Sequence, residues 1–209
     1  VRAPFEIDGR LVPSSVSLGI SSSKLNSDRG STLFRHADIA LYEAKKAGRN
    51  CFMTFHQDMN QQLTRRQSLQ NDLASATEWG ELFLLFQPIV DLATNATQGF
   101  EALLRWQHRE LGLISPTEFI PIAEESGQIG PIGSWVIDAA CMHAASLPTK
   151  TFIAVNVSAA QLTNPALVLQ TRASLTKHGV SPGRLEIEIT ESTLIENDER
   201  ALVVLDQSA

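Results

Sequence analysis

Oxygen-bearing side chains alternate with apolar ones in three short segments in the second half of the chain. Glu101 shares the first segment with Arg105, Asn156 lies in the second, and Glu186 and Glu188 lie in the third. Successive side chains of a strand point to opposite faces, so each segment would present its polar residues on one face. If the three strands are neighbours, carboxylate and amide oxygens gather on one side of a sheet. Ligands of this kind select hard cations such as Mg²⁺, Mn²⁺ or Ca²⁺.

An antiparallel sheet with one solvated face would show the same alternation without any function. Helical patterns between the segments favour another arrangement, because strands joined by helical crossovers run parallel and are buried on both faces. Carboxylates inside a barrel are costly unless they are paired or bind metal. Glu101, Asn156 and Glu188 also lie near the C-terminal ends of their strands, where barrel enzymes assemble their active sites.

Strand and helix patterns alternate from Leu82 onward, which is typical of a mostly parallel sheet or a barrel. The predicted strands are Leu82–Ile89, Gly99–Trp106, Phe152–Val157 and Leu185–Thr190. One helix is predicted to begin with a capping box at Ser115–Glu118, with Pro116 as its first residue, and to end at Gly127. Further helices are predicted over Ile132–Ser146, Pro165–His178 and Ser192–Leu205.

The first part of the chain has a strand and helix pattern of its own. Strands are predicted around Ser15–Ile20 and over Cys51–Phe55, and a helical apolar stripe that includes Phe34 lies between them. Gly48 is expected to end that helix, because glycine tolerates a positive φ. Apolar residues at heptad-like spacing over Met59–Ala76 then predict an exposed linking helix, and we place the domain boundary there.

Composition narrows the classes of function. The 209 residues are 43% hydrophobic and 19% charged, which indicates a soluble, folded chain of two units, at least one of them incomplete. A formal net charge of −6 argues against a general nucleic-acid binder. Cys51 and Cys141 show no metal-ligand spacing, and no apolar run reaches the ~18–20 residues of a membrane span. We therefore expect a cytoplasmic chain, whose parent could carry a membrane anchor upstream.

Five blocks of the second half resemble the EAL family in order and spacing. They are Gln87–Ile89, Glu101–Trp106, Ser115–Glu124, Asn156–Ser158 and Glu188–Glu191. The resemblance runs from about Leu82 to the end of the chain. It implies a modified (β/α)₈ barrel whose first strand runs antiparallel to the others. The expected fold class is therefore α/β, with part of a TIM-like barrel following a smaller α/β piece.

The EAL resemblance also implies an activity. The family hydrolyses one phosphodiester bond of cyclic diguanylate with two Mg²⁺ or Mn²⁺ ions, and two-metal hydrolysis suits a site of oxygen ligands. The residues that match its metal ligands and catalytic centre are Glu101, Asn156 and Glu188, and those that match its substrate-binding residues are Gln87, Leu104 and Arg105. Glu191 ranks lower, because an acid in the first turn of the next helix would also suit the positive end of the helix dipole.

Residues 1–55 resemble the end of a GGDEF domain, which is a nucleotidyl-cyclase-like α/β domain. The resemblance rests on Val16–Ile20 and Ala37–Asn50. In the family the positions of Lys45 and Arg49 contact the triphosphate of GTP, and a spacing of four puts them on one helical face. Cations at a helix C-terminus are also favoured by the helix dipole alone. No Gly-Gly-Asp-Glu-Phe motif occurs in the chain, so we expect no cyclase activity from it.

The sequence thus predicts three segments: the end of a GGDEF domain at 1–55, a linking helix at 56–81, and the first half of an EAL domain at 82–209. We expect the full-length parent to be a homodimeric cyclic-diguanylate phosphodiesterase, with GTP as a candidate ligand of the GGDEF part. The chain itself is expected to be inactive, because the family's paired aspartates and its later Lys, Glu and Gln positions are absent from it. A degenerate receptor that binds cyclic diguanylate without cleaving it and a dimerisation scaffold are the alternatives.

Overall fold

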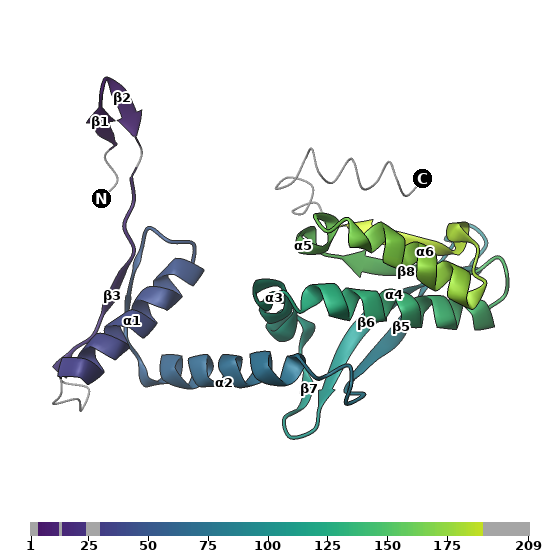
Figure 1. Ribbon diagram of the computed structural model, residues 1–209, viewed down its shortest axis with the longest axis horizontal. Coiled ribbons are helices and arrows are strands. Elements are labelled where there is room, and N and C mark those ends of the chain that lie inside the picture. Colours follow the sequence, from purple (N-terminus) through teal and green to yellow (C-terminus); the bar gives the residue numbers. More distant parts are fainter. Residues whose placement is uncertain (1–3, 13, 24–29, 190–209) are drawn as a thin grey trace. The chain divides into compact units, whose positions relative to one another are not determined.

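The computed structural model describes residues 4–12, 14–23 and 30–189 (Figure 1). Its contacts divide the chain into two compact units, Val1–Ser68 and Leu69–Ala209. Each unit has a buried core of its own. The predicted strand end at Thr190 and the predicted helix Ser192–Leu205 lie outside the described residues. Within the described ranges, no helix combines the length and apolar character that a bilayer crossing requires.

The first unit is a small α/β piece. β3 (Leu18–Ile20) pairs in parallel with β4 (Phe52–Thr54), and α1 (Gly30–Lys46) packs on both strands. Both predicted strands and the helix between them are therefore present, although β3 is shorter than predicted. The structure adds an antiparallel hairpin of β1 (Phe5–Ile7) and β2 (Arg10–Val12), which the sequence analysis did not predict.

The hairpin between β1 and β2 turns at Asp8 and Gly9, whose φ angles are 51° and 74°. Positive φ at both central residues is what a type I′ turn requires, and Asp-Gly is a favoured pair for it. This dipeptide is the signal by which the hairpin could have been found in the sequence.

α1 buries a narrower stripe than the sequence predicts. Ile39, Ala40 and Ala44 are buried, but Phe34 is 72% exposed, so its placement in the buried stripe is wrong. Met53, Phe55, Met59 and Leu63 pack against Ile39 and Ala40, so this is the side of α1 that is covered. Gly48 follows the helix with a φ of 100°, which confirms it as the residue that ends the helix.

α2 (Gln57–Leu73) forms the predicted linking helix. Met59 and Leu63 pack against the core of the first unit, whereas Leu69 and Leu73 are buried in the core of the second. Most of the other side chains of α2 are exposed, in keeping with the prediction of an exposed helix.

The second unit is built on one sheet with the strand order β5-β6-β8-β9, and β7 pairs with β6 as a short hairpin. β5 runs antiparallel to β6, whereas β8 is parallel to β6 and β9 is parallel to β8. One antiparallel strand followed by parallel ones is the order that the EAL resemblance implies. The strands are β5 (Leu82–Val90), β6 (Thr97–His108), β7 (Gly112–Ile114), β8 (Phe152–Val157) and β9 (Leu185–Ile189).

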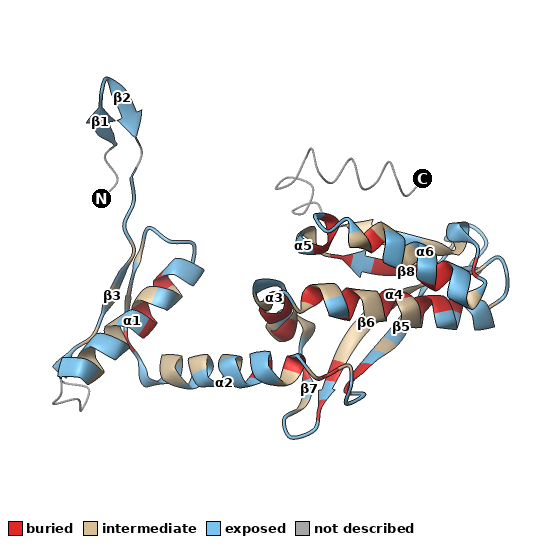
Figure 2. Cartoon of the chain, viewed as in Figure 1, coloured by how far each residue is buried: buried red, intermediate tan, exposed pale blue. Residues whose placement is uncertain are grey.

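Helices pack on one face of this sheet (Figure 1). In chain order they are α3 (Pro116–Ser126), α4 (Ile129–Ser146), α5 (Ala159–Leu162), α6 (Ala166–His178) and the 3₁₀ helix η2 (Pro182–Arg184). Val136, Ile137 and Ala140 of α4 share the core with Ile153 and Val155 of β8. Figure 2 shows buried stretches, in red, along α4 and β8. Because the apolar side chains of β8 are buried against α4, its polar side chains lie on the opposite face of the strand.

The predicted start and end of α3 are confirmed, but the predicted capping box is not. Ser115 is the N-cap residue, Pro116 is the first helical residue, and Gly127 ends the helix with a φ of 77°, as predicted. The predicted capping box is wrong, because the Ser115 side chain makes no capping hydrogen bond. Its hydroxyl oxygen instead lies 2.7 Å from the hydroxyl oxygen of Thr117. A nearby hydroxyl has replaced the backbone N–H as its partner.

Replacing Gly19 by alanine should destabilise the first unit. A Cβ at Gly19 would collide with the carbonyl oxygen of Ala37 and the backbone of Leu41, which cannot rotate away. We expect G19A to lower the free energy of unfolding by about 1–3 kcal/mol, as other overpacked sites do. Urea unfolding followed by circular dichroism measures this change. The matched control is G30A, where a new Cβ meets nothing within 4 Å. An equal loss of stability in the two variants would contradict the close approach of α1 and β3.

Candidate active site

Glu101, Asn156 and Glu188 lie on the neighbouring strands β6, β8 and β9. Asn156 Nδ2 donates a hydrogen bond of 2.7 Å to Glu101 Oε1. Glu188 is the register partner of Asn156, so both side chains leave the sheet on the same face. The structure therefore brings together the three residues that the alternating pattern singled out. Glu191 lies outside the described residues.

The buried apolar face of β8 fixes the position of Asn156, which lies on the opposite face. Ile153, Val155 and Val157 are at most 3% exposed. Sliding the strand by one residue would bury Asn156 and expose all three aliphatic side chains. Since burying each of them contributes roughly 1.5–3 kcal/mol, the apolar face fixes the register of the polar one.

The carboxylates of the site crowd one another. The pKa of Glu188 is raised above its ordinary value, mainly because burial disfavours the charged form. The negative charges of Glu101 and Glu186 raise it further. A positive charge placed between these carboxylates would relieve both effects.

The donor set fits a hard divalent cation. Asn156 turns its Nδ2 to Glu101, which leaves its Oδ1 as a ligand beside the carboxylates of Glu101 and Glu188. Two carboxylates and a carboxamide are the oxygen ligands that Mg²⁺ and Mn²⁺ prefer. In the part of the chain that the structure describes, no group of three or more His, Cys, Asp or Glu side chains is arranged to hold a metal. A metal site with Glu101 and Glu188 would therefore draw its third oxygen from the amide of Asn156.

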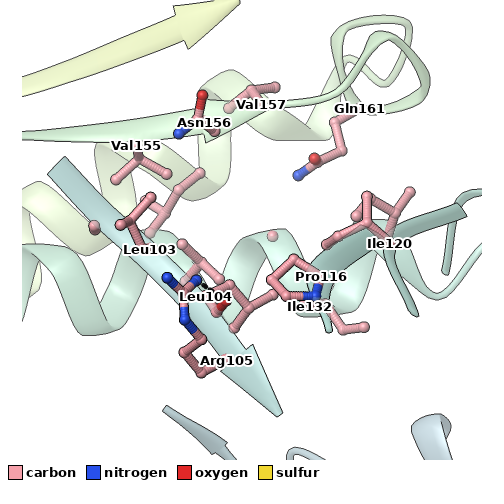
Figure 3. A pocket seen from close by; sticks show the side chains of 15 residues that line it. Leu103, Leu104, Arg105, Pro116, Ile120, Ile132, Val155, Asn156, Val157 and Gln161 are labelled. Atoms are coloured by element: carbon pink, nitrogen blue, oxygen red, sulfur yellow. Dashed lines mark hydrogen bonds between the residues drawn. The ribbon is translucent and has the colours of Figure 1, made fainter. Parts of the chain in front are cut away.

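Gln87 and Arg105 flank Glu101. Gln87 on β5 is the register partner of Glu101. Arg105 lies on β6, on the same face as Glu101 by the period-two rule. Its Nη1 donates a 2.8 Å hydrogen bond to the carbonyl oxygen of Leu104 (Figure 3). A guanidinium has five N–H donors, and this bond uses one of them.

A pocket of about 180 Å³ lies beside these residues. Arg105 and Asn156 line it, and apolar side chains of α3 and α4, among them Ile120 and Ile132, form another wall (Figure 3). Leu104 also lines the pocket, and it packs against the hydrophobic core. Its neighbour Arg105 belongs to the opposite face of β6. Contact of Leu104 with a substrate stays a prediction.

Gln161 is a pocket residue that the sequence analysis missed. It is 6% exposed, and its Oε1 accepts a hydrogen bond of 3.1 Å from the backbone N–H of Ser158. Its amide lies so close to Gly133 that a Cβ there would collide with it. The available signal was the Ser-x-x-Gln spacing directly after the predicted strand, which is a capping-box pattern.

The predicted nucleotide contacts of the first unit need one correction. Lys45 lies in the last turn of α1, but the helix ends at Lys46 and Arg49 has a φ of 61°. The two residues are therefore not neighbours on one helical face, because the helical spacing stops before Arg49. The reason is the left-handed turn that begins at Gly48. Contact of either residue with GTP stays a prediction.

The fold and the site together define a barrel-type domain in which oxygen-bearing side chains lie on one face of a mixed sheet and helices cover the other. The chain belongs to the EAL domain family, whose model matches residues 67–208. Residues 1–51 match the model of the diguanylate cyclase GGDEF domain. The resemblance predicted from the motifs is thereby confirmed. EAL phosphodiesterases generally depend on divalent metal ions.

Curated proteins similar to this chain match it over nearly its whole length. An uncharacterised signalling protein from Caulobacter vibrioides is 41% identical over 200 residues, which cover 96% of this chain and 25% of the relative. The cyclic di-GMP phosphodiesterase PdeR from Escherichia coli is 38% identical over 210 residues, which cover 99% of this chain and 32% of PdeR. The chain thus spans 25–32% of the length of these curated relatives.

The fold also matches a solved structure, that of the PaMucR phosphodiesterase in complex with c-di-GMP. The TM-score is 0.64 and the sequence identity is 40%. The match covers 68% of this chain and 59% of the other. It confirms the predicted α/β fold class with a TIM-like barrel part.

Replacing Glu101 by glutamine should lower the pKa of Glu188. The substitution removes one of the two negative neighbours that raise this pKa, and the smaller effect of Glu186 and the burial of Glu188 remain. Carboxyl ¹³C chemical shifts measured against pH report the change. E110Q, which alters an exposed carboxylate in the turn between β6 and β7, is the control and should leave the pKa of Glu188 unmoved. A Glu188 titration identical in E101Q and the unaltered chain would show that the two carboxylates do not interact.

Proposed function

We propose that this chain is part of a metal-dependent phosphodiesterase that hydrolyses one phosphodiester bond of cyclic diguanylate (c-di-GMP) to give the linear dinucleotide. The observation that carries the proposal is the hydrogen bond between Asn156 and Glu101, with Glu188 at the adjacent register position. Three oxygen-bearing side chains from separate strands thereby share one face. The PdeR relative and the PaMucR structure, both named as phosphodiesterases, support it.

Each residue has a distinct task in this proposal. Glu101, Asn156 and Glu188 hold Mg²⁺ or Mn²⁺ through their side-chain oxygens. Bound divalent ions lower the pKa of a water molecule and stabilise the attacking and leaving oxygens. Arg105 grips a phosphate oxygen, for which a guanidinium offers paired N–H donors.

The remaining predicted residues bind the rest of the substrate or support the site. Gln87, beside Glu101 in the sheet, contacts a guanine base. Leu104 supplies an apolar contact from the pocket wall. Glu191 supports the metal ligands from the residues that follow β9.

The predicted segments 1–55, 56–81 and 82–209 remain our proposal for the domain organisation. The first unit would bind GTP through Lys45 and Arg49 as a ligand-sensing part, and the parent would act as a homodimer in the cytoplasm. Support comes from the match of residues 1–51 to the GGDEF model. The proposed activity belongs to the full-length parent, and we propose that the 209 residues alone are inactive.

Variants of the site in the full-length parent test the proposed reaction. E101Q, N156A and E188Q should each lower kcat for c-di-GMP hydrolysis by roughly 100-fold or more, the scale expected when a preorganised electrostatic group is lost. Chromatographic separation of c-di-GMP from the linear dinucleotide measures turnover at saturating Mn²⁺. E110Q serves as the matched control and should keep the rate of the unaltered protein.

Two other results are informative. Binding of c-di-GMP by calorimetry without any turnover in the unaltered parent would assign it to the degenerate receptors. Neither binding nor turnover would favour the dimerisation scaffold.

Removal of metal should abolish the same activity reversibly. Chelation with EDTA takes away the ions that Glu101, Asn156 and Glu188 hold, and added Mn²⁺ or Mg²⁺ should restore the rate. N156A should need a higher Mn²⁺ concentration for half-maximal activity, because it lacks one ligand. Full activity in the presence of EDTA would contradict a metal-dependent mechanism.

A further inference from the structure

A buried carboxylate lies where the linking segment meets the first strand of the barrel part. Glu81 is 7% exposed and directly precedes β5. A buried charge at this position requires hydrogen-bond partners, because its desolvation is otherwise uncompensated. The partners of its carboxylate are Trp106, near the C-terminal end of β6, and Arg109, which follows that strand. Among the described residues, those proposed above for the active site make no hydrogen bond or ion pair with its carboxylate.

Glu81 contacts three of the four residues from Trp106 to Arg109. Its Oε2 accepts a 3.0 Å hydrogen bond from Trp106 Nε1, and its backbone carbonyl accepts one of 2.8 Å from the Gln107 N–H. Its Oε1 accepts the Arg109 N–H at 3.3 Å and lies 3.7 Å from Arg109 Nε. We call Glu81 with these three partners the Glu81 clamp. The clamp fixes the end of the strand that carries Arg105 and Glu101.

The surroundings of the clamp hold it in place. Trp106 is fully buried and packs edge-on against Phe119 of α3. The guanidinium of Arg109 lies 3.5 Å above the ring of Trp79, a cation–π contact. These contacts restrict both the indole and the guanidinium that meet Glu81.

His108 ties the same strand end to α2. It is 3% exposed, and its Nε2 lies 3.2 Å from Asp72 Oδ2. Its Nδ1 accepts the backbone N–H groups of Glu110 and Leu111 at 3.1 and 3.2 Å. Because Nδ1 accepts, the proton of the neutral ring is assigned to Nε2, which donates to Asp72. His108 is therefore part of a polar network that joins the end of β6 to α2.

We infer that Glu81 is a positioning residue for Arg105, acting through Trp106 and the clamped end of β6. This inference rests on the proposed function, in which Arg105 grips the substrate phosphate. Arg105 is the sequence neighbour of Trp106 and pairs in register with Phe83, two residues after Glu81. Loss of the carboxylate leaves the buried indole N–H without its partner, and the strand end is free to shift. A shift of about 1 Å is enough to remove much of what a positioned side chain contributes to binding or catalysis.

A double-mutant cycle in the full-length parent tests this inference. E81Q replaces one of the two acceptor oxygens by an NH₂ group, so that either the Trp106 Nε1–H or the Arg109 N–H loses its acceptor. It should raise the KM for c-di-GMP about tenfold and change kcat less than about twofold, because phosphate binding and not the metal chemistry is disturbed. In the R105A background, E81Q should change KM less than about twofold, since the group that it positions is gone. A KM change of the same size in both backgrounds, or no change in E81Q alone, would overturn the inference.

A control variant and a substitute for E81Q complete the test. E110Q, which alters an exposed carboxylate in the same turn, is the matched control and should leave KM unchanged. If E81Q does not fold, as shown by thermal unfolding, R109A replaces it, because it removes a 49% exposed partner of Glu81 and leaves the buried indole bond intact. R109A should raise KM about threefold, an effect that R105A should again abolish.

The two proposals fail in different ways. If the unaltered parent shows no turnover, the proposed function is wrong. The dissociation constant of c-di-GMP, measured by calorimetry in EDTA, then replaces KM in the same cycle and still decides whether Glu81 acts through Arg105.

Discussion

The burial of the aliphatic face of β8 against α4 is the constraint on which the rest of the second unit depends. Ile153 and Val155 share a core with residues of α4, and this packing sets which side chains of the strand face the other way. Asn156 lies on that other face because its neighbours in sequence are buried. Its hydrogen bond to Glu101 and its register with Glu188 follow from the same packing. The packing of apolar side chains in the core thus determines which face of the sheet carries the polar side chains of the site.

The carboxylates on the polar face repel one another, and this repulsion fits the proposed binding of a metal ion. Glu188 is partly desolvated and is repelled by Glu101 and Glu186, so its pKa is raised. Residues arranged only for stability would avoid such crowding, because like charges oppose each other most where solvent is excluded. A divalent cation turns this repulsion into attraction. The same crowding that disfavours the metal-free site would therefore favour a bound hard cation.

Much of the fold could be predicted from the sequence because its strands and helices have strong periodicity. β8 has the predicted bounds, and Gly127 ends α3 as expected. The failures have local physical causes. The Ser115 hydroxyl meets the Thr117 hydroxyl in place of a backbone N–H, and the described core beside α1 includes Ile39 and Ala40 but leaves Phe34 exposed. Periodicity reports which residues can share a face, but not whether another element covers that face.

The sequence by itself determined the family, the alternation that puts Glu101, Asn156 and Glu188 on one face, and the oxygen chemistry of the site. Only the tertiary structure decided which strands are neighbours, and so that Asn156 meets Glu101 across 55 positions of sequence. It also revealed Glu81 as a buried clamp on β6. The physical reason is that side-chain type and spacing are local properties. Strand order, burial and the hydrogen bonds of a buried carboxylate depend on which distant segments pack together.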